Sequence, residues 1–282
     1  MPPPILARRL SLYGPGRAGR ALLRSWHAAG GALGQIGGRD AAALELVRRE
    51  LDLPPSASGQ DVDAPCDIFV LAVPDDAVAP VAASLNPVAC RFAFHLSGAL
   101  PAAALRPLSR PGVSLGSLHP LRVFSGAPGE TWEGAFVAVE GETAAIETGL
   151  AAAQAVGARG RRLAASGKAL YHAGAQLAAG GTTAVISLAS RAWVEAGLDL
   201  EEARAELSLL AGSAAAAAAA RPFSEAFTGA VARRDVATIR AHIEALKSDP
   251  DALAVYRALA AETLARTPGR GREEEVRTLL GC

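Results

Sequence analysis

The chain has 282 residues, of which 50% are hydrophobic and 20% are charged, a composition typical of a folded globular protein long enough for two domains. Its 28 basic and 28 acidic side chains balance, which argues against a nucleic-acid partner, and no basic amphipathic helix favours a membrane surface. The three cysteines, Cys66, Cys90 and Cys282, do not have the spacing of a metal site, so we expect neither disulfides nor zinc. The sequence shows neither a signal-peptide pattern nor an apolar run that could span a bilayer, and we expect a protein of the reducing cytoplasm.

Residues 10–29, LSLYGPGRAGRALLRSWHAA, predict a strand, a glycine turn and a helix in direct succession. The spacing GxGxxG between a strand and a helix is typical of a dinucleotide-binding crossover. We expect the glycines to make the tight turn, to admit a pyrophosphate to the backbone and to let the helix pack on the strand. The alternative is a glycine-rich turn without a nucleotide. The predicted cofactor residues of the turn are Gly14, Pro15, Gly16, Arg17, Ala18 and Gly19.

A second strand is predicted at residues 32–36, followed by Gly37, Gly38, Arg39 and Asp40. The end of this strand meets the adenosine ribose in dinucleotide-binding folds, where an acidic residue selects NAD and an arginine can hold the 2′-phosphate of NADP. Arg39 therefore favours NADP over NAD. Asp40 is the competing detail, and a role as N-cap of a helix over residues 41–50 leaves Arg39 for the phosphate.

Residues 68–73, IFVLAV, predict a strand covered on both faces of a parallel sheet, because the run is apolar almost without a break. A short helix should start at Pro74-Asp75-Asp76, where the two acidic residues either cap the helix or contact a ligand. The carboxyl end of this strand should lie beside the nicotinamide half of the cofactor, so Val73 and Pro74 are predicted cofactor contacts.

Two further strands, at residues 92–95 and 113–118, each deliver a histidine at the carboxyl end, His95 and His119. Histidine suits proton transfer near neutral pH, and two that converge on one cleft favour a catalytic site. The alternative is that each histidine caps its strand end by a hydrogen bond to the backbone. A strand at residues 136–140, a helix at 143–156 and a short strand or connection at 161–163 should follow.

From about residue 164 the pattern becomes helical and rich in alanine. The first long helix, residues 166–192, carries Lys168, His172 and Gln176 at four-residue spacing and therefore on one face. Titratable groups on an otherwise apolar helix favour a functional site over a solvated stripe. The alanine run at 214–220 is a strong helix former whose small side chains suit core or dimer packing.

The ordered motifs GPGRAG, VPDD, HLSG, SLHPLRVF and KALYHAG, with the later FTGAVARRD and His242, resemble a family of Rossmann-like proteins of unassigned activity with a helical C-terminal domain. Its wider relatives are pyrroline carboxylate reductase, the β-hydroxyacid dehydrogenases and prephenate dehydrogenase. The resemblance implies an α/β fold: an N-terminal Rossmann dinucleotide-binding domain, residues 1–163, followed by an all-α C-terminal domain, residues 164–282, that forms a homodimer. It also implies that the active cleft is lined by His95, Ser97, His119, Lys168 and His172.

The chain departs from the family in three places. Ala179-Gly180 stands where the family tends to have Ser-Asn near the substrate, which puts a conventional hydroxyacid reaction in doubt. Gly229-Ala230 replaces the usual Gly-Pro, and Arg122 stands where an uncharged polar residue is more usual.

These features predict an NADP-dependent oxidoreductase that transfers a hydride to or from a carbonyl or imine carbon of a small polar substrate, with an anionic one favoured. Lys168 is the expected proton donor or electrostatic stabiliser, and His172 tunes its pKa or acts as the acid. Substrate contacts are expected from Ser97, His95, His119, Arg122 and Gln176, and no metal site is expected. The alternatives are an NADP-binding sensor or scaffold without turnover, and a dimer that has lost the nucleotide.

Overall fold

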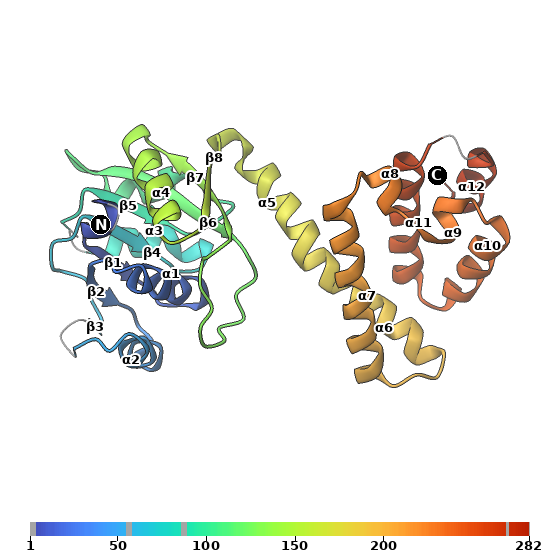
Figure 1. Ribbon diagram of the computed structural model, residues 1–282, viewed down its shortest axis with the longest axis horizontal. Helices are drawn as coiled ribbons and strands as arrows, with labels where there is room; N and C mark the ends of the chain where they lie inside the picture. Colours follow the sequence, from blue (N-terminus) through green and yellow to red (C-terminus); the bar gives the residue numbers. More distant parts are fainter. Residues whose placement is uncertain (1–3, 55–57, 86–88, 269–270, 282) are drawn as a thin grey trace. The chain divides into compact units, whose positions relative to one another are not determined.

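The computed structural model describes residues 4–54, 58–85, 89–268 and 271–281. The chain forms two compact units, Met1–Ala175 and Gln176–Cys282 (Figure 1). The first is an α/β unit with a Rossmann sheet and the second is all helical, which confirms the predicted fold class. The domain boundary between residues 163 and 164 stays a prediction; the compact units divide later, so the start of the first long helix belongs with the Rossmann unit.

The first unit is built on a sheet in the order β3-β2-β1-β4-β5-β6-β7-β8. All neighbouring strands are parallel except β6 and β7, which are antiparallel. This order places β1, the strand before the glycine turn, inside the sheet between β2 and β4. The strands are β1 (Leu10–Tyr13), β2 (Leu33–Gly37), β3 (Ser58–Gly59), β4 (Ile68–Leu71), β5 (Phe92–His95), β6 (Ser114–Leu121), β7 (Phe136–Gly141) and β8 (Arg159–Arg162).

Helices cover both faces of this sheet, which explains why its central strands are apolar without alternation. In β4, Ile68 and Val70 pack into the core under α1 (Arg17–Ala28), α2 (Ala41–Glu50) and α4 (Thr143–Ala155). The intervening Phe69 and Leu71 pack into a second core under α3 (Asp75–Ser84) and the 3-10 helix η3 (Ala102–Leu108). Every side chain of the strand is therefore removed from water, as in other doubly covered parallel sheets.

The strand β6 is longer than the sequence predicts. The expected strand ended before His119, but β6 runs from Ser114 to Leu121 and contains that histidine. The extension has a physical cause: β5 ends at His95, opposite Ser117, and beyond that point β6 remains paired with β7 on its other side. His119 therefore lies within an antiparallel ladder, past the end of the neighbouring parallel strand.

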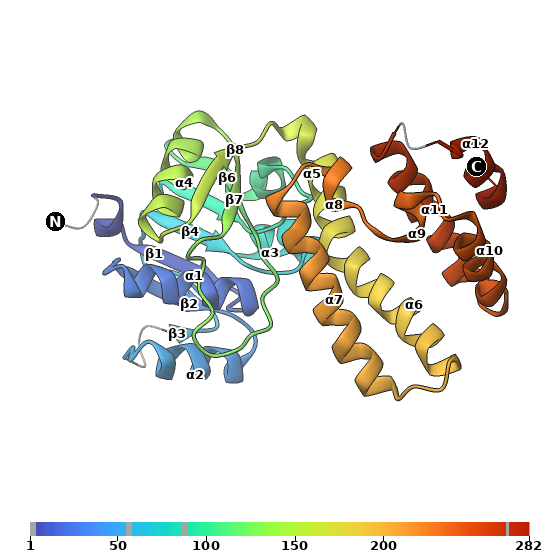
Figure 2. The ribbon, with the colours of Figure 1, turned by 45° about the vertical axis from the view of Figure 1, so that its right-hand side comes forward.

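The second unit consists of helices with a small core of its own. A π-helical segment, Leu177–Gly181, links α5 (Lys168–Gln176) to α6 (Thr182–Glu195), and α6 lies beside α7 (Leu200–Ala220) (Figure 2). The core joins α10 (Val236–Ala245), α11 (Pro250–Arg266) and α12 (Glu273–Leu280) through side chains such as Ile239, Leu264 and Val276. The short helices α8 (Phe223–Ala226) and α9 (Gly229–Arg233) connect α7 to this core. No helix in the described ranges is long and apolar enough to cross a membrane.

The loop between β6 and β7 is fastened along α1, the helix that follows the glycine turn (Figure 1). Trp132, 1% exposed, donates its indole N–H to the Ala18 carbonyl at 3.1 Å, and its backbone N–H bonds to the Ser25 hydroxyl at 2.8 Å. The guanidinium of Arg24 donates to the Ala127 and Glu130 carbonyls of the same loop. The loop is therefore bonded to α1 both in its first turn, at Ala18, and further along the helix, at Arg24 and Ser25.

Replacing Trp132 by alanine should destabilise the Rossmann unit by about 3–5 kcal/mol, because it leaves a large cavity against α1. Trp132→Phe keeps most of the volume and loses the hydrogen bond to Ala18, so its cost should be smaller, about 1–2 kcal/mol. Urea unfolding followed by circular dichroism measures both values. Equal stability of Trp132→Ala and the wild type would contradict this account of the loop.

Candidate functional site

The glycine turn after β1 leaves no room for side chains at two of its three glycines. Gly14 has φ +86°, and a β-carbon there would lie 2.7 Å from Cγ1 of Val73 and 2.9 Å from the Ala72 carbonyl oxygen. A β-carbon at Gly19 would lie 3.0 Å from that of Ala72. These contacts give Gly14 and Gly19 the roles that the spacing predicts, a tight turn and close packing of helix on strand. They also bring Val73 against the turn.

Gly16 differs, because the space around it is open. The atom nearest to a β-carbon at Gly16 would be the Ala72 carbonyl oxygen, 3.9 Å away. Gly16 is also the N-cap of α1 and has no side chain to pair the N–H groups of the first turn. Unpaired N–H groups and the positive end of a helix dipole, with room in front, suit a phosphate. The turn therefore fits a dinucleotide's pyrophosphate.

The end of β2 lies against the same turn. A β-carbon at Gly38 would be 3.0 Å from Cδ of Pro15. Asp40 accepts hydrogen bonds from the backbone N–H groups of Ala42 and Ala43, so it is the N-cap of α2, as predicted. Arg39 is exposed and has no hydrogen bond or ion pair with any residue that the structure describes. Its guanidinium is therefore available to a ligand near the turn.

His95 ends β5 and uses both ring nitrogens on its own loop. Its Nδ1 accepts from the Ser97 backbone N–H at 3.1 Å, and its Nε2 lies 3.1 Å from the Pro101 carbonyl oxygen, to which it donates. Burial lowers the pKa of His95 to about 4, which keeps the imidazole neutral. These bonds are those of a strand-end cap, and they leave neither ring nitrogen for a substrate in this conformation.

Lys168, at the start of α5, is buried and bonded to protein atoms. Its Nζ donates to the Ser97 carbonyl at 3.2 Å and to the Ser117 hydroxyl at 2.7 Å, and lies 3.8 Å from a carboxylate oxygen of Glu140. The same oxygen of Glu140 accepts from the Ala102 backbone N–H at 2.8 Å. Burial lowers the pKa of Lys168, against the opposing effect of the carboxylates of Glu140 and Asp75.

His119 and His172 come together beside Gly98. Their rings are T-shaped with centroids 5.6 Å apart, and His119 Nδ1 lies 2.9 Å from the hydroxyl of Tyr171. A β-carbon at Gly98 would lie 2.6 Å from Nδ1 of His172 and 2.8 Å from Nε2 of His119. Nδ1 of His172 is buried without a hydrogen-bond partner among the described residues. Burial, together with the neighbouring His172 and Lys168, lowers the pKa of His119 to about 4.

Two predicted substrate residues are not part of this cluster. Arg122 donates to the Thr131 and Glu133 carbonyls, so its guanidinium is engaged with the loop between β6 and β7. Gln176 is the first residue of the helical unit, where its side chain turns toward Gly180.

Pro74 is the N-cap of α3, and Asp75 and Asp76 occupy the first turn of that helix.

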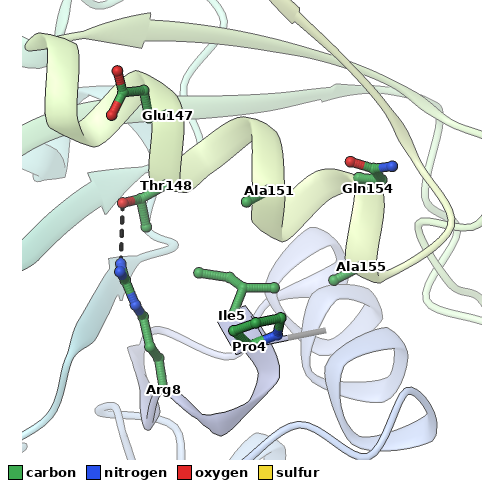
Figure 3. A pocket seen from close by; sticks show the side chains of 8 residues that line it. All are labelled: Pro4, Ile5, Arg8, Glu147, Thr148, Ala151, Gln154 and Ala155. Carbon is green, nitrogen blue, oxygen red and sulfur yellow. Dashed lines mark hydrogen bonds between the residues drawn. The ribbon is translucent and has the colours of Figure 1, made fainter. Parts of the chain in front are cut away.

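A cavity of about 660 Å³ lies away from the predicted site (Figure 3). It is formed by the 3-10 helix η1 (Pro4–Ala7), Arg8 and one side of α4. Arg8 bonds to Thr148 at 3.2 Å within it, and no predicted site residue lines it. The candidate site therefore stays at the carboxyl ends of the parallel strands.

Sequence reasoning missed Tyr171, Ser117 and Glu140. Glu140 had a signal, because it is a lone carboxylate at the end of an apolar strand pattern and must find a partner if buried. Tyr171 precedes His172 directly, yet its partner His119 lies 52 positions away in the sequence. Nothing local links the two residues, so only the fold brings them together.

Comparisons with known proteins extend these observations. Residues 135–263 match the family model described as a domain of unknown function, DUF2520. A solved structure from Bacteroides fragilis, named as a candidate NADP oxidoreductase, is 17% identical with a TM-score of 0.75 over 93% of this chain and 100% of that one. A Thermotoga maritima protein is 19% identical with a TM-score of 0.74 over 92% and 98%. No curated protein sequence matches the chain.

A pyrroline-5-carboxylate reductase from Coxiella burnetii shares the fold as well, with 14% identity and a TM-score of 0.56 over 96% of this chain and 98% of that one. The resemblance predicted from the motifs is thus confirmed: the chain is a Rossmann-like protein with a helical C-terminal region. At these identities the solved structures establish the fold, and the reaction has to be argued from the site.

The buried, neutral His95 makes stability depend on pH. Its pKa of about 4 in the folded chain lies below the usual 6.5, so the unfolded chain binds more protons between these values. The free energy of unfolding should therefore fall as the pH drops from about 6.5 to about 4, with about 3 kcal/mol at most from this residue. Denaturation across this range should give a shallower slope for His95→Gln than for the wild type.

The matched control is His27→Gln, which replaces an exposed histidine of α1. A His95→Gln variant with the wild-type pH dependence would show that His95 is not held neutral.

Proposed function

We propose that the chain is an NADP-dependent oxidoreductase that transfers a hydride to or from a carbonyl or imine carbon of a small polar substrate, with an anionic one favoured. The supporting observation is one row of paired residues across four parallel strands: Tyr13, Leu71, His95 and Ser117. The glycine turn follows the first of them and the histidine cluster surrounds the last two. Three strand spacings, about 14 Å, separate the two ends of the row.

A nicotinamide cofactor supplies the hydride, and the protein supplies binding, orientation and charge. The open backbone at Gly16 binds the pyrophosphate, and Val73 and Pro74 contact the nicotinamide half where β4 ends. His119 and His172 bind the reacting group of the substrate beside Gly98. Ser97 keeps its hydroxyl proton for the substrate, because its oxygen accepts from the Ala99 and Leu100 N–H groups.

Lys168 acts as an electrostatic stabiliser, the second of the two roles expected for it. Its ammonium bonds to the carbonyl of Ser97, so its charge reaches the site through that residue and not by direct contact. This positive charge supports the preference for an anionic substrate. A reducing cytoplasm stays the expected location.

The alternative function is an NADP-binding sensor or scaffold without turnover. One observation favours it: the side-chain nitrogens of His95 and Lys168 form hydrogen bonds within the protein itself. NADPH binding without oxidation across a panel of carbonyl and imine compounds would support this alternative over an enzyme.

We also propose that the chain forms a homodimer through its helical unit. The helix α7 exposes Leu209 and Leu210, which are 69% and 62% exposed, and the alanine run that follows them is also largely exposed. An apolar helix face of this kind is costly in water and, with small side chains, suits close packing against a second copy.

Arg39→Ala should raise the Kd for NADPH about 10-fold to 100-fold and leave the Kd for NADH unchanged, because the arginine is proposed to bind the 2′-phosphate. Calorimetric titration of the purified chain with each cofactor measures both constants. Arg49→Ala is the matched control, since Arg49 is an exposed arginine in the last turn of α2, at the end of that helix remote from Arg39. If neither cofactor binds the wild type, the oxidoreductase proposal is wrong.

The double variant Leu209→Glu/Leu210→Glu should convert the dimer to a monomer, because association would bury unpaired carboxylates. Light scattering after size exclusion gives the mass of each species. Val123→Glu, which changes a residue 76% exposed in the Rossmann unit, should remain dimeric. A monomeric wild type would contradict the dimer proposal.

A further inference from the structure

Among the residues that the structure describes, Tyr171 carries the one hydroxyl that bonds to a histidine of the candidate site. Its oxygen lies 2.9 Å from Nδ1 of His119, and the two rings meet edge to face with centroids 5.6 Å apart. The other side of Tyr171 lies near Phe136, at 6.4 Å between ring centroids. The side chain of Tyr171 therefore extends from α5 to His119 of β6 and Phe136 of β7, with its hydroxyl directed at one ring nitrogen.

The direction of this hydrogen bond decides what His119 can do. A neutral imidazole carries its proton on only one of its two nitrogens. The hydrogen-bond partner of the other nitrogen determines which of the two is protonated. Tyr171 has no other hydrogen-bond partner among the described residues, so its hydroxyl proton is donated to Nδ1 of His119. Burial raises the pKa of Tyr171 and lowers that of His119, so both groups are neutral near pH 7.

We infer that Tyr171 is a positioning residue: its hydroxyl donates to Nδ1 of His119, keeps the ring proton on Nε2, and makes His119 a hydrogen-bond donor to the substrate. Nε2 of His119 and Nδ1 of His172 lie 2.8 Å and 2.6 Å from the position that a β-carbon of Gly98 would occupy, so both nitrogens lie against the side of Gly98 that carries no side chain. The substrate atom bound there is thus an acceptor, such as a carbonyl oxygen or an imine nitrogen.

The use of His119 as a donor rests on the proposed function, but its tautomer does not. The groups that act on its charge are His172 and Lys168 from α5 and Asp75 from α3. His172 and Lys168 oppose the protonation of His119, and the Asp75 carboxylate favours it. The neutral imidazole acts here by hydrogen bonding to developing charge, so no proton is removed from Nε2.

Long-range ¹H–¹⁵N NMR of the cofactor-free protein near neutral pH tests the inference. The wild type should show His119 with a protonated Nε2 and an unprotonated Nδ1. In Tyr171→Phe the donor to Nδ1 is lost, which destabilises the neutral imidazole, so the pKa of His119 should rise by about 0.5–1. A protonated Nδ1 in the wild type, or an unchanged His119 titration in Tyr171→Phe, would overturn it.

The chain offers a matched control in the helical unit. His242 Nδ1 lies 3.1 Å from the hydroxyl of Tyr256, in a second T-shaped pair with ring centroids 5.8 Å apart. Tyr256→Phe removes the same atom and should change the signals of His242 while leaving those of His119 as in the wild type. The measurement needs neither cofactor nor substrate. Failure of NADPH to bind would therefore count against the proposed function alone.

Discussion

A buried ammonium group must keep its partners, because removing one member of a buried ion pair costs about 3–5 kcal/mol. In this chain the buried ammonium group is that of Lys168, at the start of α5. Its partners are Ser97 in the loop that follows β5, Ser117 in β6 and Glu140 in β7. The position of α5 over the carboxyl ends of these strands follows from satisfying that charge. Tyr171 and His172, one turn further along, reach His119 only because Lys168 is fixed there.

The parallel sheet supplies the second condition for the site. Adjacent parallel strands keep residues of equal depth side by side, so the ends of β1, β4 and β5 form one edge. The glycine turn and the histidine loop leave the sheet at that edge, although about 80 residues separate them in the sequence. The antiparallel β7 then extends β6 past this edge, which carries His119 beyond the row and toward α5.

The parts of the site that depend on local physics could be predicted from the sequence. The glycine turn is such a part, since steric limits at Gly14 and the N-cap of α1 are set by neighbouring residues. The capping role of Asp40 is another. The pairing of Tyr171 with His119 could not be predicted, because it depends both on the register of β6 against β7 and on the position in which Lys168 is buried. The extra length of β6 was missed for the same reason.

Trp132 has a consequence beyond the stability of its loop. Trp132 is bonded to α1, and Trp26, a residue of that helix, is fully buried and donates to the Ala32 carbonyl. The third tryptophan of the chain, Trp193, lies in the helical unit. Indoles in apolar surroundings emit at shorter wavelengths than indoles in water. Once Trp193 is replaced by phenylalanine, the tryptophan fluorescence comes from the Rossmann unit alone, and the unfolding of that unit can be followed without an added label.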